Sequence, residues 1–201
     1  MIHVIGDSHA LYTFREIDGV AVHHLGPMTM RRASDPADNT LRGCVGGCGL
    51  TPADRVVFCL GEIDVRCHIH SRVQQPDTSV LIVVIGLVDA YLKRIVELPR
   101  FGATFGVMSV PPPSGYERDL NETYPMLGTD EDRALYTKAI NAFLLRGCLD
   151  LGLVFVDLYS AFVGVNGLLP PSLSDGEVHL KNPWRVGLVL RDLGWIDGVS
   201  P

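Results

Sequence analysis

A serine near the start of the chain and a carboxylate–imidazole pair far along it could together perform nucleophilic chemistry. Ser8 follows a short apolar run that ends at Gly6, and Asp175 and His179 lie four residues apart. A serine hydroxyl is a weak nucleophile at neutral pH, and it becomes reactive when an imidazole takes its proton and an acid orients that imidazole. The residue types therefore predict a triad in which Ser8 is the nucleophile, His179 the general base and Asp175 the orienting acid.

Alternating strands and helices would have to position these groups. Apolar runs predict strands at residues 1–6, 20–25, 55–60, 104–110 and 154–158, and helices at 77–98, 129–149 and 182–193. The strands are mostly continuously apolar, as expected when both faces of a parallel sheet are buried. The pattern predicts an α/β fold, a three-layer α/β/α sandwich with right-handed crossovers. Sites in such sheets form beyond the carboxyl ends of the strands, where Ser8 and Gly26 would lie together.

Composition narrows the classes of function. The chain has 201 residues, 47% of them hydrophobic, which suits one domain over residues 1–201. The net charge of −6 without a Lys/Arg cluster argues against nucleic acid as a partner. We expect a cytoplasmic protein without a membrane segment, because the amino terminus lacks signal-peptide features and the apolar run 80–88 is too short to span a bilayer. The odd number of cysteines, five, favours reduced thiols over disulfides. The predicted helix 77–98 is apolar nearly all round, so one of its faces could form a homodimer interface.

Four sequence blocks together resemble the SGNH/GDSL hydrolase superfamily of esterases and lipases. The blocks are Gly6-Asp7-Ser8-His9, Gly26 after the second strand, Gly61-Glu62-Ile63-Asp64, and Asp175 to His179. The resemblance implies a flavodoxin-like sandwich with a five-stranded parallel sheet, an oxyanion hole formed by the N–H groups of Ser8 and Gly26, and no cofactor. It also implies hydrolysis of a small acyl ester, on a carbohydrate or a small metabolite. Gly61, Glu62, Asp64 and Arg66 are the candidate substrate-contacting residues.

The sequence departs from the family pattern at two places. Ile63 occupies the position of an asparagine that donates a hydrogen bond to the oxyanion, and losing such a donor typically costs about 10²–10³ in turnover. The acid and the base are usually three residues apart, whereas Asp175 and His179 are separated by four, which a helical turn could absorb. Two further functions therefore remain open, an acyltransferase that uses the same triad and a catalytically degenerate binding protein.

Simpler roles compete for several of these residues. Ser8 could cap a helix and Asp175 could be a turn residue. Gly26 and Gly61 could be ordinary glycines at the ends of strands, with no role in a site. Glu62, Asp64 and Arg66 could form an ion-pair network that holds their loop.

The cysteines and the polar segment 114–128 carry two further expectations. Cys44 and Cys48 lack a clear second pair of zinc ligands, so the sequence predicts no metal site, and zinc-dependent hydrolysis would require stoichiometric metal. Residues 114–128 make a long connection, which could form a flap over the site or could decorate the surface.

Overall fold

Five parallel strands form one sheet in the computed structural model, which describes residues 1–115 and 123–197. The strands are β1 (Ile2–Gly6), β2 (Val20–His24), β3 (Arg55–Cys59), β4 (Thr104–Met108) and β5 (Val154–Val156). Their order is β2-β1-β3-β4-β5, with every neighbouring pair parallel. This is the order of flavodoxin-like sheets. All five predicted strands are present, and each ends within two residues of its predicted bounds.

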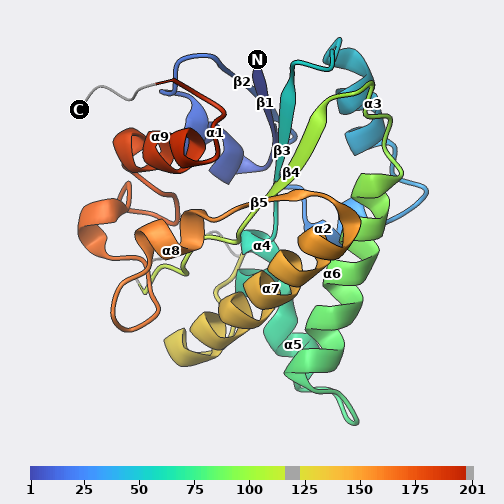
Figure 1. Cartoon of the computed structure of the whole chain (residues 1–201). Helices are drawn as coiled ribbons and strands as arrows, with labels where there is room; N and C mark the ends of the chain where they lie inside the picture. The colour runs from blue at the N-terminus through green and yellow to red at the C-terminus, as the bar shows by residue number, and fades with distance from the viewer. Residues whose placement is uncertain (116–122, 198–201) are drawn as a thin grey trace.

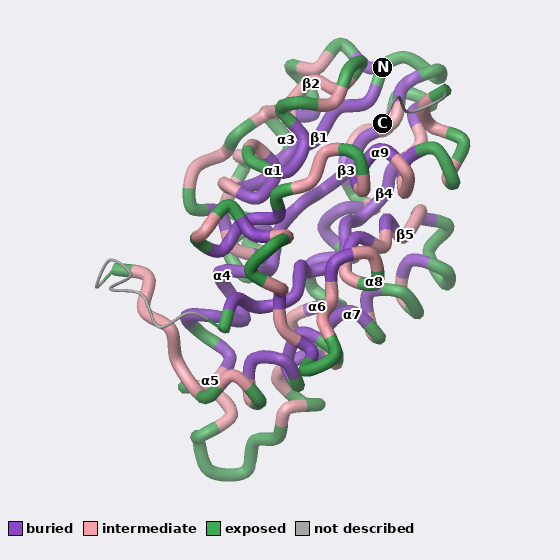
Figure 2. The backbone as a smooth tube through the Cα atoms, turned by 90° about the vertical axis from the view of Figure 1, so that its left-hand side faces the viewer, coloured by how far each residue is buried: buried purple, intermediate pink, exposed green. Residues whose placement is uncertain are grey.

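Helices cover both faces of the sheet, which confirms the predicted three-layer sandwich (Figure 1). One face carries α3 (Thr40–Gly47), α6 (Val80–Val96) and α7 (Asp130–Leu151), and the other carries α1 (Ser8–Phe14), α8 (Leu158–Phe162) and α9 (Pro183–Asp192). Successive strand residues point to opposite faces. Ile5 therefore packs in the core below α6 and α7, whereas Val4 packs in the core below α1 and α9. Figure 2 shows the resulting burial of the central strands.

The predicted long helices are present, and local capping explains where they begin. Thr129 and Asp132 form a reciprocal capping box at the start of α7, and the Asn182 side chain accepts the N–H of Arg185 at the start of α9. The shorter elements were not predicted, because four residues are too few to show a period. They are α2 (Met30–Ala33), α4 (Glu62–Asp64), the π-helical turn η1 (Val65–Ile69), α5 (His70–Val73) and the 3₁₀ turn η2 (Pro171–Leu173).

The surface of the described residues bears on two further expectations. Across residues 1–115 and 123–197, no helix combines the length and the apolar character needed to cross a membrane. The start of α6 exposes Leu81, Ile82 and Ile85, so the face that suggested a homodimer is at the surface of this chain. The homodimer itself stays a prediction.

Candidate active site

Ser8 stands where β1 turns into α1. Gly6 ends β1 so close to β3 that an added Cβ would lie 2.0 Å from the Cys59 carbonyl oxygen, so only glycine fits there. Asp7 caps α1, because its carboxylate accepts the N–H of His9 at 2.9 Å. Ser8 is thus the first residue of the helix and is itself not the cap. Its side chain lies partly exposed, within reach of solvent.

His179 and Asp175 come from the loop between η2 and α9. An antiparallel bridge between Ser174 and Leu180 closes this loop, and the Asp175 N–H donates to the His179 carbonyl at 3.2 Å. Gly176 adopts a left-handed conformation, with φ of +92°. A compact non-helical turn, in place of the helical turn that the spacing suggested, therefore absorbs the four-residue separation.

The three side chains form one continuous hydrogen-bonded chain. His179 Nε2 lies 3.0 Å from Ser8 Oγ, and His179 Nδ1 lies 2.8 Å from Asp175 Oδ2. An ionised carboxylate can only accept, so Nδ1 carries the proton and Nε2 is free to accept the serine proton. This is the geometry of a nucleophile, a base and an orienting acid.

Burial and hydrogen bonding tune the two titratable members. Burial lowers the pKa of His179, and the nearby His9 lowers it further, which outweighs the opposing effect of Asp175. Burial alone would raise the pKa of Asp175, but hydrogen bonds from the Glu177 N–H and from His179 bring it below its ordinary value. Asp175 is therefore ionised and His179 neutral at pH 7, as general-base chemistry requires.

Two aromatic neighbours on α1 pack against His179. The Tyr12 ring centroid lies 4.3 Å from that of His179, and the His9 ring centroid lies 4.9 Å from it. Tyr12 follows Ser8 by one helical turn and therefore lies on the same helix face, and this four-residue spacing is the sequence signal that points to it. The buried His9 donates from Nε2 to the Val178 carbonyl at 3.0 Å, which ties α1 to the loop that carries His179.

Gly26 lies beyond β2, next to the loop that begins after β1. The parallel register pairs Gly6 with His24, and the Leu25 N–H donates to the Gly6 carbonyl at 2.7 Å. Gly26 has a φ of +69°, which favours glycine. Within residues 1–115 and 123–197, the N–H groups of Ser8 and Gly26 have no backbone partner, so both are available to an external acceptor.

Glu62 and Arg66 form a buried ion pair behind the triad. Arg66 donates from Nε and Nη2 to the two Glu62 oxygens at 2.6 and 3.1 Å, and from Nη1 to the Tyr124 carbonyl at 2.7 Å. Burial alone would raise the pKa of Glu62, but the charges of His9 and Arg66 hold it below its ordinary value. These contacts fit the expectation of a network that holds the loop, and a direct role in substrate binding stays a prediction.

The other residues of this block also have internal partners. Asp64 accepts the N–H groups of Met30 and Arg31 at 2.7 and 3.3 Å and so anchors the start of α2. Gly61 has a φ of +119°, and a Cβ there would lie 2.6 Å from the Met30 side chain. Ile63 is buried and supplies no polar donor at the asparagine position. Of the predicted flap, residues 116–122 lie outside the described residues.

One group of side chains beside Ser8 has donor types that suit a metal ion. The ligand atoms of Asp175, Glu177 and His179 all lie within 4.8 Å of one another. A metal bound there would compete with the Asp175–His179 hydrogen bond and leave Ser8 without an oriented base. The triad and a metal are thus alternative uses of the same side chains.

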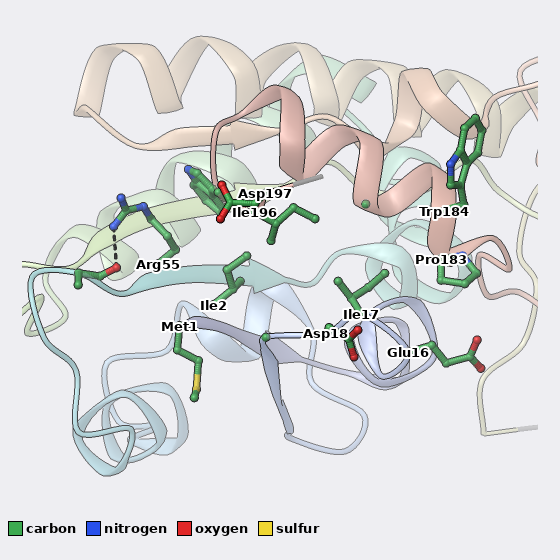
Figure 3. Close-up of a pocket in the computed structure, with 14 residues that line it drawn as sticks. Met1, Ile2, Glu16, Ile17, Asp18, Arg55, Pro183, Trp184, Ile196 and Asp197 are labelled. Carbon is green, nitrogen blue, oxygen red and sulfur yellow. Dashed lines mark hydrogen bonds between the residues drawn. The ribbon is translucent and has the colours of Figure 1, made fainter. Parts of the chain in front are cut away.

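A cavity of about 730 Å³ lies at the end of the sheet where the strands begin, opposite the end that carries Ser8 (Figure 3). Met1, Ile2 and Arg55 line it from the amino ends of β1 and β3, together with Trp184 of α9. Ser8 follows the carboxyl end of β1, so this cavity is separate from the triad.

Comparison with solved structures identifies the fold. No protein-family model matches the sequence, and neither does any curated protein. Solved structures do match. A GDSL-like lipase from Bacteroides thetaiotaomicron superposes with a TM-score of 0.61 at 14% identity, over 96% of this chain and 84% of that one. A carbohydrate acetylesterase from Sinorhizobium meliloti gives 0.59 at 14% identity, over 97% and 99%. The chain has the fold of the SGNH/GDSL hydrolases.

The GDSL-type fold also occurs in proteins described without an enzymatic name. The OSK domain of Drosophila Oskar superposes with a TM-score of 0.59 at 14% identity, over 94% of this chain and 86% of that domain. At such identities the similarity establishes the architecture alone, so activity has to be argued from the side chains of this chain.

Proposed function

We propose that the protein is a serine esterase that hydrolyses small acyl esters through Ser8, His179 and Asp175. The observation that carries this proposal is the continuous hydrogen-bonded chain from Ser8 Oγ through the His179 ring to Asp175. The alternative role of Ser8 as a helix cap is excluded because Asp7 caps α1, and a cap would not explain why a neutral imidazole faces the Ser8 hydroxyl.

The reaction proceeds as a two-step acyl transfer. Ser8 Oγ attacks the ester carbonyl carbon while His179 Nε2 takes its proton, and the same proton then goes to the departing alkoxide. Asp175 stabilises the imidazolium that forms in between. A water then attacks the acyl-serine carbonyl carbon while His179 Nε2 takes its proton. That proton passes to Ser8 Oγ as the bond between Oγ and the acyl carbon breaks and the carboxylic acid is released. No step requires a cofactor.

The oxyanion is stabilised by backbone groups. The unpartnered N–H groups of Ser8 and Gly26 supply two donors, while Ile63 supplies none where the family has an asparagine. Removing one donor from an oxyanion hole typically lowers the turnover number by a factor of about 10²–10³. We therefore expect a slow esterase, most active on esters with good leaving groups.

The site suits a small acyl group. Tyr12 and His9 pack against His179 and Ser8 is only partly exposed, and on these contacts we propose that the acyl group is small. The similarity to a carbohydrate acetylesterase makes acetyl esters of sugars the first natural substrates to test, beside acetyl esters of small metabolites. The same acyl-serine could pass its acyl group to another hydroxyl, so products should be compared with and without an added alcohol.

Labelling with a fluorophosphonate probe tests the proposal directly. The wild type should be labelled, the Ser8→Ala and His179→Ala variants should not, and a Ser71→Ala variant at an exposed serine should behave like the wild type. Folding of every variant is checked by circular dichroism. Absence of labelling and of acetyl-ester hydrolysis in folded wild-type protein would contradict the proposal.

A binding protein is the second candidate, and Ile63 is the observation that favours it. A site that binds a ligand without turnover has no need of the missing donor. This candidate predicts that Ser8 stays unlabelled while ligand binding survives in Ser8→Ala.

A further inference from the structure

A second group of chemically capable side chains lies on the other face of β1, away from the triad. His3 of β1 and His23 of β2 point to the face covered by α3, because residues two apart on a strand share a face and His3 pairs with Ala21. His3 Nδ1 lies 3.0 Å from His23 Nε2, and Cys48 Sγ lies 3.6 Å from the same nitrogen. The three donor atoms all lie within 4.8 Å of one another.

Cys44 lies outside this group of three and is the candidate for a fourth donor. It precedes Cys48 by four residues on α3, so the two side chains share one helix face. Cys48 Sγ lies 3.1 Å from the Cys44 carbonyl oxygen and 3.6 Å from His23 Nε2, so the part of α3 that carries both cysteines faces His23. Both cysteines are free and half-buried.

We propose that His3, His23, Cys44 and Cys48 form a tetrahedral zinc site. Two imidazoles and two thiolates are a donor set that Zn²⁺ takes in structural sites. Zn–N and Zn–S bonds of about 2.1 and 2.3 Å require N···N and N···S separations of about 3.4 and 3.6 Å around a tetrahedron. The observed Cys48–His23 separation of 3.6 Å matches this value, and the His3–His23 separation of 3.0 Å is slightly shorter. The site would form when the two rings separate slightly and the Cys44 side chain turns towards them.

A direct hydrogen bond between the histidines is the competing explanation. The two rings are nearly parallel, at 16°, with centroids 5.3 Å apart, which suits an N–H···N contact. That contact explains the histidines but leaves unexplained why the Cys48 thiol also lies 3.6 Å from His23 Nε2.

The role of the site would be structural. β2 is an edge strand of the sheet, and a shared metal would fasten it to β1 and to α3. His3 precedes Gly6 by three residues, or about 10 Å along a strand, so the metal would lie well away from Ser8. The sequence predicted no metal site because Cys44 and Cys48 lack a second pair nearby along the chain, and the two strands supply that pair.

Titration of the metal-free chain with Co²⁺, followed by displacement with Zn²⁺, tests the proposal. We expect one equivalent of Co²⁺, a thiolate charge-transfer band, intense tetrahedral absorption and a higher melting temperature with Zn²⁺. Cys48→Ser and His23→Gln should weaken binding at least about tenfold. The matched control His68→Gln, at an exposed histidine outside the group, should bind like the wild type.

A measurement on the wild type alone covers the case in which the variants do not fold. Zn²⁺ should protect Cys44 and Cys48 from alkylation by iodoacetamide, as followed by peptide mass spectrometry. Unchanged alkylation, or the absence of a thiolate band with Co²⁺, would overturn the proposal. The proposal would also be overturned if folded His23→Gln still bound Co²⁺ while Glu177→Gln did not. That pattern would assign the metal to the group of side chains beside Ser8.

Discussion

Replacing Asp175 by asparagine tests the triad at its most specific contact. Asp175 Oδ1 accepts the N–H groups of Glu177 and His179 at 2.8 and 3.3 Å, while Oδ2 accepts from His179 Nδ1. An asparagine would keep its carbonyl oxygen on the two backbone donors, which turns its NH₂ group towards Nδ1. An NH₂ group can only donate, so Nδ1 would become the acceptor and the ring proton would move to Nε2.

The magnitude follows from this change of tautomer. With its proton on Nε2, His179 donates towards Ser8 and cannot take the serine proton, a loss that costs about 10⁴ in turnover in serine hydrolases, or about 5 kcal/mol. Stability should change little, because the two backbone hydrogen bonds survive.

The assay measures kcat/KM for p-nitrophenyl acetate at pH 8, together with the rate of fluorophosphonate labelling. Glu177→Gln is the matched control, because it removes an exposed carboxylate two residues away and leaves the N–H that Asp175 accepts. The reasoning fails if folded Asp175→Asn keeps more than about a tenth of the wild-type kcat/KM, or if Glu177→Gln loses as much activity.

Three further outcomes follow from buried groups. His9 lowers the pKa of His179, so His9→Gln should move the acidic limb of the kcat/KM–pH profile to higher pH, and an unmoved limb would count against a charged His9. Burial raises the pKa of Asp64 from 3.8 to about 7, so the folded state keeps a proton that the unfolded state releases. The free energy of unfolding should therefore fall as pH rises from about 4 to about 7, and Asp64→Asn should flatten this dependence by up to about 4 kcal/mol in urea titrations. Gly61→Ala should lower the free energy of unfolding by at least about 1–3 kcal/mol, because its Cβ would overlap Met30, and wild-type stability would refute that steric argument.

The sequence by itself determined the sheet and the long helices. Continuous apolar runs mark strands buried on both faces, and caps such as Thr129 and Asn182 mark helix starts, because both signals depend on neighbouring residues. Because the carboxyl ends of parallel strands lie at one end of a sheet, the sequence also predicted that Ser8 and Gly26 lie close together.

Only the tertiary structure decided which side chains meet. Ser8 and His179 are 171 positions apart in the sequence and meet only in the complete fold, and a non-helical turn fixes the distance from Asp175 to His179. From the sequence, Glu62 and Arg66 could either contact the substrate or form an ion pair that holds their loop. The structure shows the ion pair, buried inside the protein. The approach of His3 and His23 to Cys48 has no local signature, because contacts between separate elements depend on sheet register and helix packing, which a local pattern does not encode.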